Sequence, residues 1–385
     1  MITHLLSVTD TAFGTGTGTG NDDSAAIQAC IDAAAGETNA TVYFPPASYN
    51  LGSPIVTTTS YSNLVLKGDG PTERSSHINV GFDGVAFDIA SAGFGIEGLS
   101  IKGNRALYPN SRAFRFAKTV NTDDMDARVR NVCLQEFGVA IEHKGRGFYL
   151  QDSIIALCDR AATFSWPTSG VTGTGLHVPP YGFRKTLLTG NHLHAIGVAF
   201  ENLSTTPMRG VLASGNLMDI GRGFWKGAAN ASVFGSNVIE NLNATGFEFT
   251  TSADDVQVVG NRIAGMPEPA SPDSSIYQAL SGISLQTTGT VRRFMAQGNN
   301  IRYVRQDGIR SNKAMLDSDI SGNLISDYAV DGPEFSAIAM LNTSGLANAF
   351  ASSTMRDNGG TAPVSPGVFA KINGATPGSI VDNRR

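Results

Sequence analysis

The sequence contains few charged residues and no basic cluster. Of its 385 residues, 28 are Lys or Arg and 33 are Asp or Glu, which gives a formal net charge of -5. A protein that binds nucleic acid needs Lys and Arg gathered on one face, because they must neutralise phosphates. We therefore expect no nucleic-acid partner, whereas neutral or acidic glycans stay open as ligands.

Cysteines and long apolar runs are also scarce. The chain has only Cys30, Cys133 and Cys158, and their spacing fits neither a disulfide framework nor a zinc site. We expect three buried free thiols. No stretch of 18 apolar residues occurs, and the start MITHLLSVTD lacks the basic and apolar parts of an export signal. No membrane insertion and no leader are expected.

Glycine and Asn, by contrast, are plentiful, and Asn recurs at a nearly constant interval. The recurring residues are Asn131, Asn191, Asn216, Asn237, Asn261, Asn299 and Asn323, with Asp152 in the same place once. From Asn191 onward the steps are 25, 21, 24, 38 and 24 residues. A repeat of this length with short alternating stretches and Gly or Asn corners is typical of a parallel β-solenoid. A helical repeat is excluded, because no sustained 3.6-residue period occurs outside residues 24 to 35.

Two apolar columns follow from this alignment. The residues two places after each Asn are expected to point inward, and they are Cys133, Leu193, Met218, Ile239, Ile263, Ile301 and Ile325. A second inward column follows a later Gly and comprises Val198, Phe224, Phe247, Ile283 and Ile309. The corner Asn tolerates a left-handed backbone, and its amide can bond to the next Asn in the stack. The role of this Asn column is therefore expected to be structural.

The N-terminal segment predicts a cap for the solenoid. In GNDDSAAIQACIDAAAG, Asp22 or Asp23 can begin a short helix, Ile27 and Ile31 share one face, and Gly36 ends it. Such a helix would cover the strand edges that the first coil leaves open.

The run FGTGTGTGNDDSAAIQACIDAAAGETNATVYFPPASYNL resembles the opening of the pectate-lyase-like superfamily domain. Members begin with a Gly-rich turn, an acidic pair, A-I-Q on a capping helix and Y-F-P-P-G-x-Y. This chain has GTGTGTG in place of the usual Gly-Asp-Gly, and Ala47 in place of a Gly. The resemblance implies a right-handed parallel β-helix and a polysaccharide ligand, but it carries over no active-site residue.

The predicted architecture is therefore all-β, a right-handed parallel β-helix with a short N-terminal capping α-helix. We expect a capping segment over residues 1–50 and the β-helix over 51–385. Loop inserts are expected near 104–126, 166–184 and 266–279, and such loops on a regular scaffold are where specificity is usually built.

Three titratable residues stand out among those expected to face outward, three places after the corner Asn. That column comprises Leu134, Ile155, His194, Asp219, Glu240, Ala264, Arg302 and Ser326. Asp219 and Glu240 would lie on adjacent coils, with His194 one coil before them. Two carboxylates at that separation can act on a glycosidic bond, and we expect Glu240 to be the proton donor. The alternative is that these polar side chains only keep the outer surface soluble.

Other residues are candidates for binding a sugar. A second outward column contains Trp225, Glu248 and Arg310, and an exposed indole would stack on a sugar face, whereas a buried one would belong to the core. Arg302 with Arg310 could hold a uronate carboxylate, although Asp307 nearby could pair with them instead. Trp166 and Tyr181, in the insert at 166–184, could form the wall of a glycan groove. No metal is expected, because His192 and His194 lack a third ligand, and no cofactor is expected.

Three functions remain open from the sequence. The first is a bacteriophage-type spike or fibre that binds and depolymerises a bacterial surface polysaccharide, works as a homotrimer and is located on the virion surface or outside the cell. The second is a secreted polysaccharide lyase or glycoside hydrolase, for which a lyase would shift the emphasis to Arg302, Tyr303 and Arg310. The third is an adhesive β-helix without catalysis.

Overall fold

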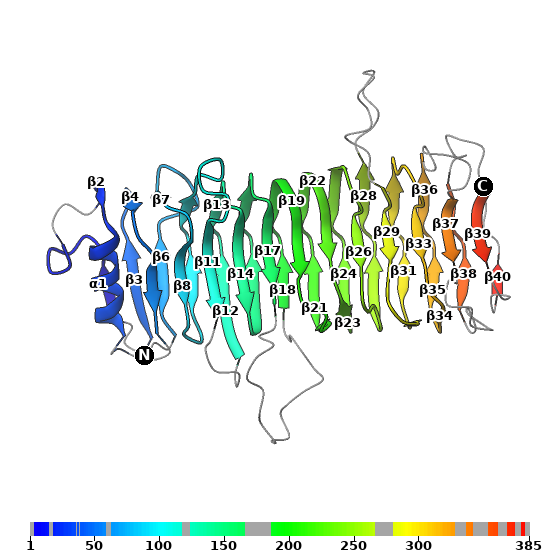
Figure 1. The fold of residues 1–385 in the computed structure, drawn as a ribbon, viewed down its shortest axis with the longest axis horizontal. Coiled ribbons are helices and arrows are strands. Elements are labelled where there is room, and N and C mark those ends of the chain that lie inside the picture. The colour runs from blue at the N-terminus through cyan, green and yellow to red at the C-terminus, as the bar shows by residue number, and fades with distance from the viewer. Residues whose placement is uncertain are drawn as a thin grey trace, which may run out of the picture. The chain divides into compact units, whose positions relative to one another are not determined.

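The computed structural model describes residues 4–14, 18–35, 37, 39–58, 63–117, 124–165, 186–265, 280–327, 336–341, 353–360, 368–373 and 379–381. The chain divides into two compact units, Met1–Ile196 and Gly197–Arg385. Each unit consists of short parallel strands that stack coil upon coil (Figure 1).

The helix α1 (Ser24–Ala34) packs its apolar face on the first coil. Ile27, Cys30 and Ile31 are fully buried on that face. The carboxylate of Asp22 accepts hydrogen bonds from the backbone N–H and the hydroxyl of Ser24, at 3.0 and 2.6 Å, and so stabilises the start of the helix. The helix lies against β3 (Ala40–Phe44) and β5 (Ile55–Thr57). The predicted capping helix is confirmed, ending at residue 34.

The strands of the N-terminal unit form three rows, which we number in the order in which a coil passes through them. The first row is β1 (His4–Ser7), β3, β6 (Val65–Gly68), β9 (Gly95–Glu97), β12 (Asp124–Arg130), β15 (Arg146–Gln151) and β18 (Thr186–Thr189). The second row is β2 (Thr19–Asp22), β4 (Ala47–Leu51), β7 (Ser76–Val80), β10 (Ser100–Lys102), β13 (Cys133–Gln135), β16 (Ile154–Ala156) and the start of β19 (His192–Asn202). The third row is β5, β8 (Val85–Ile89), β11 (Arg112–Ala117), β14 (Val139–Lys144) and β17 (Arg160–Phe164).

The C-terminal unit repeats this plan. Its first row is β21 (Val211–Ser214), β24 (Ser232–Gly235), β27 (Val256–Val259), β31 (Met295–Gln297), β35 (Asp319–Ser321), β38 (Thr354–Arg356) and β40 (Ser379–Val381). Its second row is the start of β22 (Leu217–Lys226), β25 (Val238–Leu242), β28 (Arg262–Gly265), β32 (Asn300–Arg302) and β36 (Leu324–Ser326). The third row is the end of β22, β26 (Phe247–Phe249), β29 (Ile283–Leu285), β33 (Ile309–Ser311), β37 (Ser336–Leu341) and β39 (Val368–Asn373). Two short pairs, β20 (Met208–Arg209) with β23 (Ala229–Asn230) and β30 (Val291–Arg292) with β34 (Met315–Leu316), lie beside these rows.

Every strand in these rows pairs in parallel with the corresponding strand of the next coil. The chain leaves one strand, passes through the other two rows and returns beside the first strand, and such parallel crossovers are right-handed. The predicted right-handed parallel β-helix is therefore confirmed.

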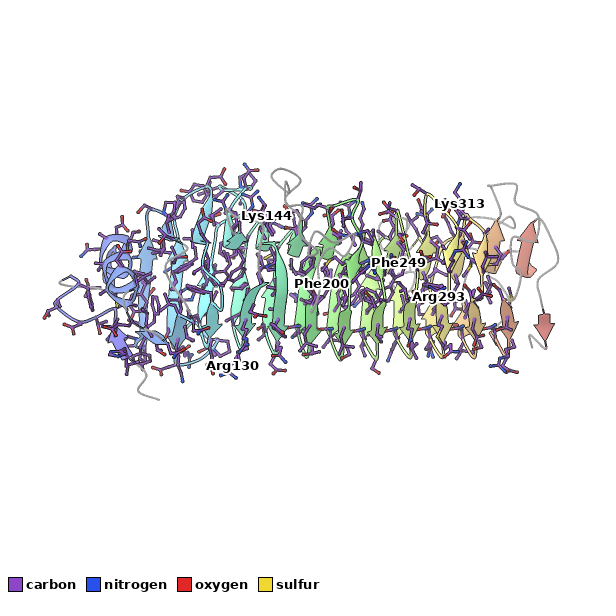
Figure 2. All side chains as sticks on the ribbon, turned by 90° about the horizontal axis from the view of Figure 1, so that it is seen from below. Arg130, Lys144, Phe200, Phe249, Arg293 and Lys313 are labelled. Atoms are coloured by element: carbon purple, nitrogen blue, oxygen red, sulfur yellow. The ribbon has the colours of Figure 1, made fainter. Side chains whose placement is uncertain are left out.

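Stacked apolar side chains fill the interior of the C-terminal unit. The first inward column contains Met218, Ile239, Ile263, Ile301 and Ile325, which pair in consecutive coils and are fully buried. Each buried Ile contributes about 2 kcal/mol to stability. The predicted stack of four isoleucines is confirmed, and Phe200 and Phe249 lie within the same interior (Figure 2).

Two residues with different roles form the corner between the first and second rows. The first has a positive φ: this is Gly98, Asn131, Asp152, Gly190, Gly215, Ser236, Gly260, Gly298, Gly322 or Asp357. The second is buried, and from Asn216 onward it is always Asn. The side-chain amide of each of these Asn residues donates to the side-chain oxygen of the next, at 2.8 to 3.0 Å, through Asn216, Asn237, Asn261, Asn299, Asn323 and Asn358.

The predicted alignment was therefore wrong by one residue in two coils. Asn131 and Asp152 occupy the left-handed position, at φ 51° and 49°, and the ladder position is held by Val132 and Ser153. A one-residue shift moves every side chain of a strand to the other face. Consequently Leu134 and Ile155 are buried in register with each other and point inward, whereas Cys133 belongs to the outward column.

Two predicted boundaries also change. Residues 104–126, expected to be an insert, contain the regular strand β11, which pairs with β8 and β14. The coils begin before residue 51, because β3 and β4 already pair with β6 and β7. The three cysteines are free and buried, as expected. The inserts expected at 166–184 and 266–279 lie outside the described residues.

Candidate functional site

Asp219 and Glu240 lie in register on neighbouring strands. Asp219 on β22 is the direct partner of Glu240 on β25, and both side chains are half-buried on the outer face of the second row. Neighbouring strands lie about 4.8 Å apart. The structure therefore places the two carboxylate-bearing residues side by side, as the spacing of Asn216 and Asn237 predicted.

Each of these carboxylates is followed by a residue with a left-handed backbone. Ile220 has φ 61° and Asn241 has φ 54°. For a β-branched residue such as Ile220 this conformation is unusual and costs about 1–3 kcal/mol. Strain of this kind is concentrated at functional sites, and here it falls inside β22, directly after Asp219.

Polar neighbours hold both carboxylates in place. The side-chain amide of Asn241 donates to Oδ1 of Asp219 at 2.6 Å. A guanidinium nitrogen of Arg262, on the next coil, lies 2.8 Å from Oε1 of Glu240. Glu240 thus has a cationic partner, and Asp219 accepts a hydrogen bond from a neutral amide. The two acids therefore differ in their surroundings, although they share one face.

The third catalytic candidate, His194, lies in the N-terminal unit. His194 occupies the corresponding position on β19, where it pairs with Ala156 of β16. Like Asp219 and Glu240, it is followed by a residue with a left-handed backbone, Ala195, at φ 51°. Its ring lies 6.5 Å from that of His192, centroid to centroid. Asp219 and Glu240 belong to the C-terminal unit.

Trp225 is not a sugar platform. Its side chain is fully buried, its ring packs on Phe234 at 4.9 Å, and its indole N–H donates to the carbonyl of Gly227 at 3.2 Å. The expectation failed because Phe224, rather than Gly223, aligns with Gly246 of the next coil. Trp225 therefore pairs with Phe247 in the inward column, and Lys226 takes the outward place beside Glu248.

The remaining binding candidates have separate surroundings. Glu248 pairs with Ser284, and Ser284 pairs with Arg310, in one column of the third row. Arg310 lies 3.4 Å from the buried carboxylate of Asp307, as the alternative of local ion pairing predicted. Arg302 donates to the side chain of Asn300 at 3.0 Å. Trp166 and Tyr181 lie outside the described residues.

A hollow that the sequence reasoning missed lies on the first row of the N-terminal unit. Its centre is an outward column of five paired residues: Val65, Gly95, Arg128, Tyr149 and Leu187. We call it the Gly95 groove, and its volume is about 490 Å³. The signal that could have indicated it is the pair Gly93 and Gly95 in SAGFGIEG, because Gly95 leaves an outward position without a side chain.

Neither a metal centre nor a membrane span emerges from the described residues. Within the described ranges, no three His, Cys, Asp or Glu side chains gather in a way that could hold a metal ion. The described part of the chain likewise contains no helix with the length and apolar character needed to cross a bilayer.

Comparison with known proteins supports the fold. Residues 6–142 match the family model described as rhamnogalacturonase A/epimerase, pectate lyase-like. No curated protein matches the sequence. The resemblance to the pectate-lyase-like superfamily, first seen in the opening residues, is confirmed over residues 6–142 by this match, and solved structures share the fold.

Three of these structures illustrate the likeness. DFA-IIIase from Arthrobacter chlorophenolicus A6, without its lid and in complex with GF2, is 16% identical, with a TM-score of 0.59 over 92% of this chain and 94% of that one. The A-module of mannuronan C-5 epimerase AlgE4 from Azotobacter vinelandii is 15% identical, with a TM-score of 0.53 over 96% and 99%. The Dettilon tailspike protein is 13% identical, with a TM-score of 0.49 over 84% of this chain and 66% of the tailspike. At these identities the first two likenesses show the fold alone, and no conclusion is drawn from the tailspike, whose TM-score is below 0.5.

Proposed function

We propose that this protein binds a polysaccharide and cleaves its glycosidic bonds, with Asp219 and Glu240 as the reacting pair. The observation that carries the proposal is the placement of two carboxylates in register on one outer face, each before a left-handed residue. The fold is also one that a mannuronan epimerase uses. The coil spacing of about 4.8 Å is close to the roughly 5–5.5 Å between the carboxyl groups of retaining glycosidases.

The surroundings of the two acids suggest a division of roles. Arg262 stabilises a negative charge on Glu240, which suits Glu240 to act as the nucleophile rather than as the proton donor expected from the sequence. Asp219, held by the neutral amide of Asn241, is then the acid. Asp219 gives a proton to the leaving oxygen while Glu240 attacks the anomeric carbon. Water then releases the sugar and returns a proton to Asp219.

The test is the degradation of acidic and neutral bacterial polysaccharides, with the products identified by mass spectrometry. We expect Asp219→Asn and Glu240→Gln each to lower the rate about a hundredfold or more, with little change in thermal stability. Asp255→Asn is a matched control, because Asp255 is also an exposed acid paired with an arginine, Arg293. Wild-type rates in both site variants would contradict the proposal.

A second candidate is an adhesive β-helix without catalysis. It is favoured by the same contacts, because both carboxylates already have partners that can serve a purely structural purpose. Intact polymer that is retained by the protein would support this function. Unsaturated product ends would instead indicate a lyase, with Arg302 and Arg310 as the residues to test.

The proposal also includes the location and the oligomeric state of the protein. We place the protein on a virion surface as a spike or fibre, or otherwise outside the cell, working as a homotrimer on a bacterial surface polysaccharide. Light scattering tests the oligomeric state. A particle of one chain mass, about 40.3 kDa, would contradict the trimer and favour a secreted enzyme.

A further inference from the structure

We propose that the Gly95 groove of the N-terminal unit is a saccharide-binding site for a sugar residue that carries a carboxylate. This site is separate from the Asp219 and Glu240 pair, and the inference does not depend on whether that pair is catalytic. The ligand would be a short stretch of an acidic polysaccharide lying across the coils of the first row.

The shape of the groove comes from a missing side chain. Gly95 stands between Val65 and Arg128 in the outward column, so that the backbones carrying these two side chains lie two strand spacings, about 9.6 Å, apart. A Cβ placed on Gly95 would lie 3.1 Å from Cγ2 of Val65. A second hollow of about 390 Å³ shares Val65, Gly95 and Arg128 with the first, and the depression therefore continues along the row.

The charge of the groove is concentrated on one well-positioned arginine. The guanidinium carbon of Arg128 lies 5.7 Å from the ring centroid of Tyr149 on the next coil, an arrangement that orients the side chain by a cation–π contact. In the described part of the chain, Arg128 has no carboxylate within ion-pair distance. A guanidinium held in this way presents its N–H donors to a planar acceptor, and a carboxylate accepts two of them at once.

The neighbouring column supplies polar groups without adding net charge. Arg130 projects outward and is paired with Glu97 at 2.8 Å (Figure 2). Gln151 follows in the same column. Sugar hydroxyls can bond to these groups, while the apolar faces of the sugar rings contact Val65 and Leu187. Asp126 lines the second hollow but not the first. Within the first hollow, Arg128 is the cation that has no carboxylate partner among the described residues, and beside an apolar floor it fits a uronate residue better than a neutral sugar.

The experiment is a calorimetric titration with tetrasaccharides of galacturonate, glucuronate and mannuronate, and with neutral tetrasaccharides of galactose and glucose. We expect at least one of the uronate probes to bind about tenfold or more tightly than the neutral ones, and this preference should weaken as salt is added. If no uronate probe binds more tightly than the neutral ones, the proposal is overturned.

Two variants locate the binding. Gly95→Leu fills the hollow; its backbone angle suits any residue because it lies within a regular strand, and the Val65 side chain must shift by a few tenths of an ångström to admit the new Cβ. Arg128→Gln removes the charge from an exposed position, so it tests the site even if Gly95→Leu folds poorly. Each should weaken uronate binding about tenfold or more. Arg293→Gln, at another exposed arginine, should leave it unchanged.

The outcomes separate this site from the proposed catalytic one. If the uronate binds only at the Asp219 and Glu240 pair, Arg128→Gln will leave its affinity unchanged and the inference fails. If Asp219→Asn and Glu240→Gln degrade polymer at wild-type rates while Arg128→Gln still loses binding, the groove stands and the catalytic proposal fails.

Discussion

The two units build the same corner in different ways. In the C-terminal unit the left-handed residue is usually Gly, and a buried Asn follows it, so that the amides form a continuous ladder. In the N-terminal unit, Asn131 and Asp152 take the left-handed place in two coils and Val132 and Ser153 follow, and among its described residues a Gly with a buried Asn after it appears only in the last coil, at Gly190 and Asn191. The backbone bend is thus common to both units, whereas the buried amide ladder begins only later in the chain.

In the sequence, one Asn column seemed sufficient both to form the bend and to bond the buried backbone groups, but in the structure two successive residues perform these two tasks. The bend needs a residue that tolerates positive φ, and Gly, Asn or Asp can supply it. The buried backbone groups at the corner need a side chain that both donates and accepts, and an amide supplies this better than the hydroxyl of Ser153 or the methyl groups of Val132. The two units should therefore respond differently to substitutions at this corner and similarly to substitutions of the inward columns.

The largest effect should come from charge placed in the inward column, in either unit. We expect Ile263→Asp and Ile155→Asp each to destabilise the protein by about 4 kcal/mol or more, because both residues are fully buried and the new carboxylate would have no partner. Ile154, the neighbour of Ile155, is 38% exposed. Ile154→Asp should cost less than about 1 kcal/mol.

Chemical denaturation measures all three variants. Equal costs at positions 154 and 155 would disprove the corrected register of the N-terminal unit. Unchanged stability of Ile263→Asp would disprove the stacked core of the C-terminal unit.

A smaller effect should separate the two corners. The side chain of Asn261 accepts from the backbone and side chain of Asn237, at 3.0 and 2.9 Å, and donates to Phe234 and Asn299, at 2.9 and 3.0 Å. We expect Asn261→Leu to cost about 3–4 kcal/mol, because several buried groups lose their partners. Ser153→Ala should cost only about 1 kcal/mol. Similar losses, measured by urea denaturation, would show that the ladder adds nothing to the bend.

The N-terminal unit should also be the more sensitive to acid. His143 is buried among Phe116, Phe148 and Phe164, and burial lowers its pKa from 6.5 to about 3. Since the folded pKa lies below the unfolded one, the folded state disfavours the protonated imidazole. Stability that is full above pH 6.5 is therefore lost as the pH falls, by about 2 kcal/mol at pH 5.

His143→Leu should remove this part of the acid dependence. The comparison is between the denaturation midpoints of wild type and variant at pH 8 and pH 5. The difference between the two proteins should change with pH, because the other titrating groups are common to both. Parallel curves would contradict the assignment to His143.

Much of the fold could be predicted from the sequence, because repeats of 21 to 25 residues with alternating apolar positions are rare outside solenoids. The stack of Ile239, Ile263, Ile301 and Ile325 followed directly from that repeat. The alignment failed at Asn131 and at Trp225, where one residue more or less in a corner moved a side chain to the other face. Local composition does not reveal such a slip, since both registers place an apolar residue inside.

The candidate site was only partly predictable. The pairing of Asp219 with Glu240 was predicted correctly, because each residue lies three places after the buried Asn of its corner, Asn216 or Asn237. Their partners were not predicted: Asn241 reaches Asp219 because of its left-handed backbone, and Arg262 comes from a third coil. The Gly95 groove was missed because it depends on the side chain that Gly95 lacks.

The amide ladder also bears on how such a chain can change in evolution. The rung between Asn216 and Asn237 is 2.8 Å and closes 21 residues, while the rung between Asn261 and Asn299 is 3.0 Å and closes 38. In both, the earlier residue donates and the later one accepts. Because every rung has the same direction and is indifferent to the length of chain it spans, whole coils can be duplicated, deleted or exchanged by recombination between corners without leaving an amide unpaired. A coil bounded by two of these Asn residues can therefore be exchanged as a unit. Its outer loops can change in length while the stacking of the coils is preserved.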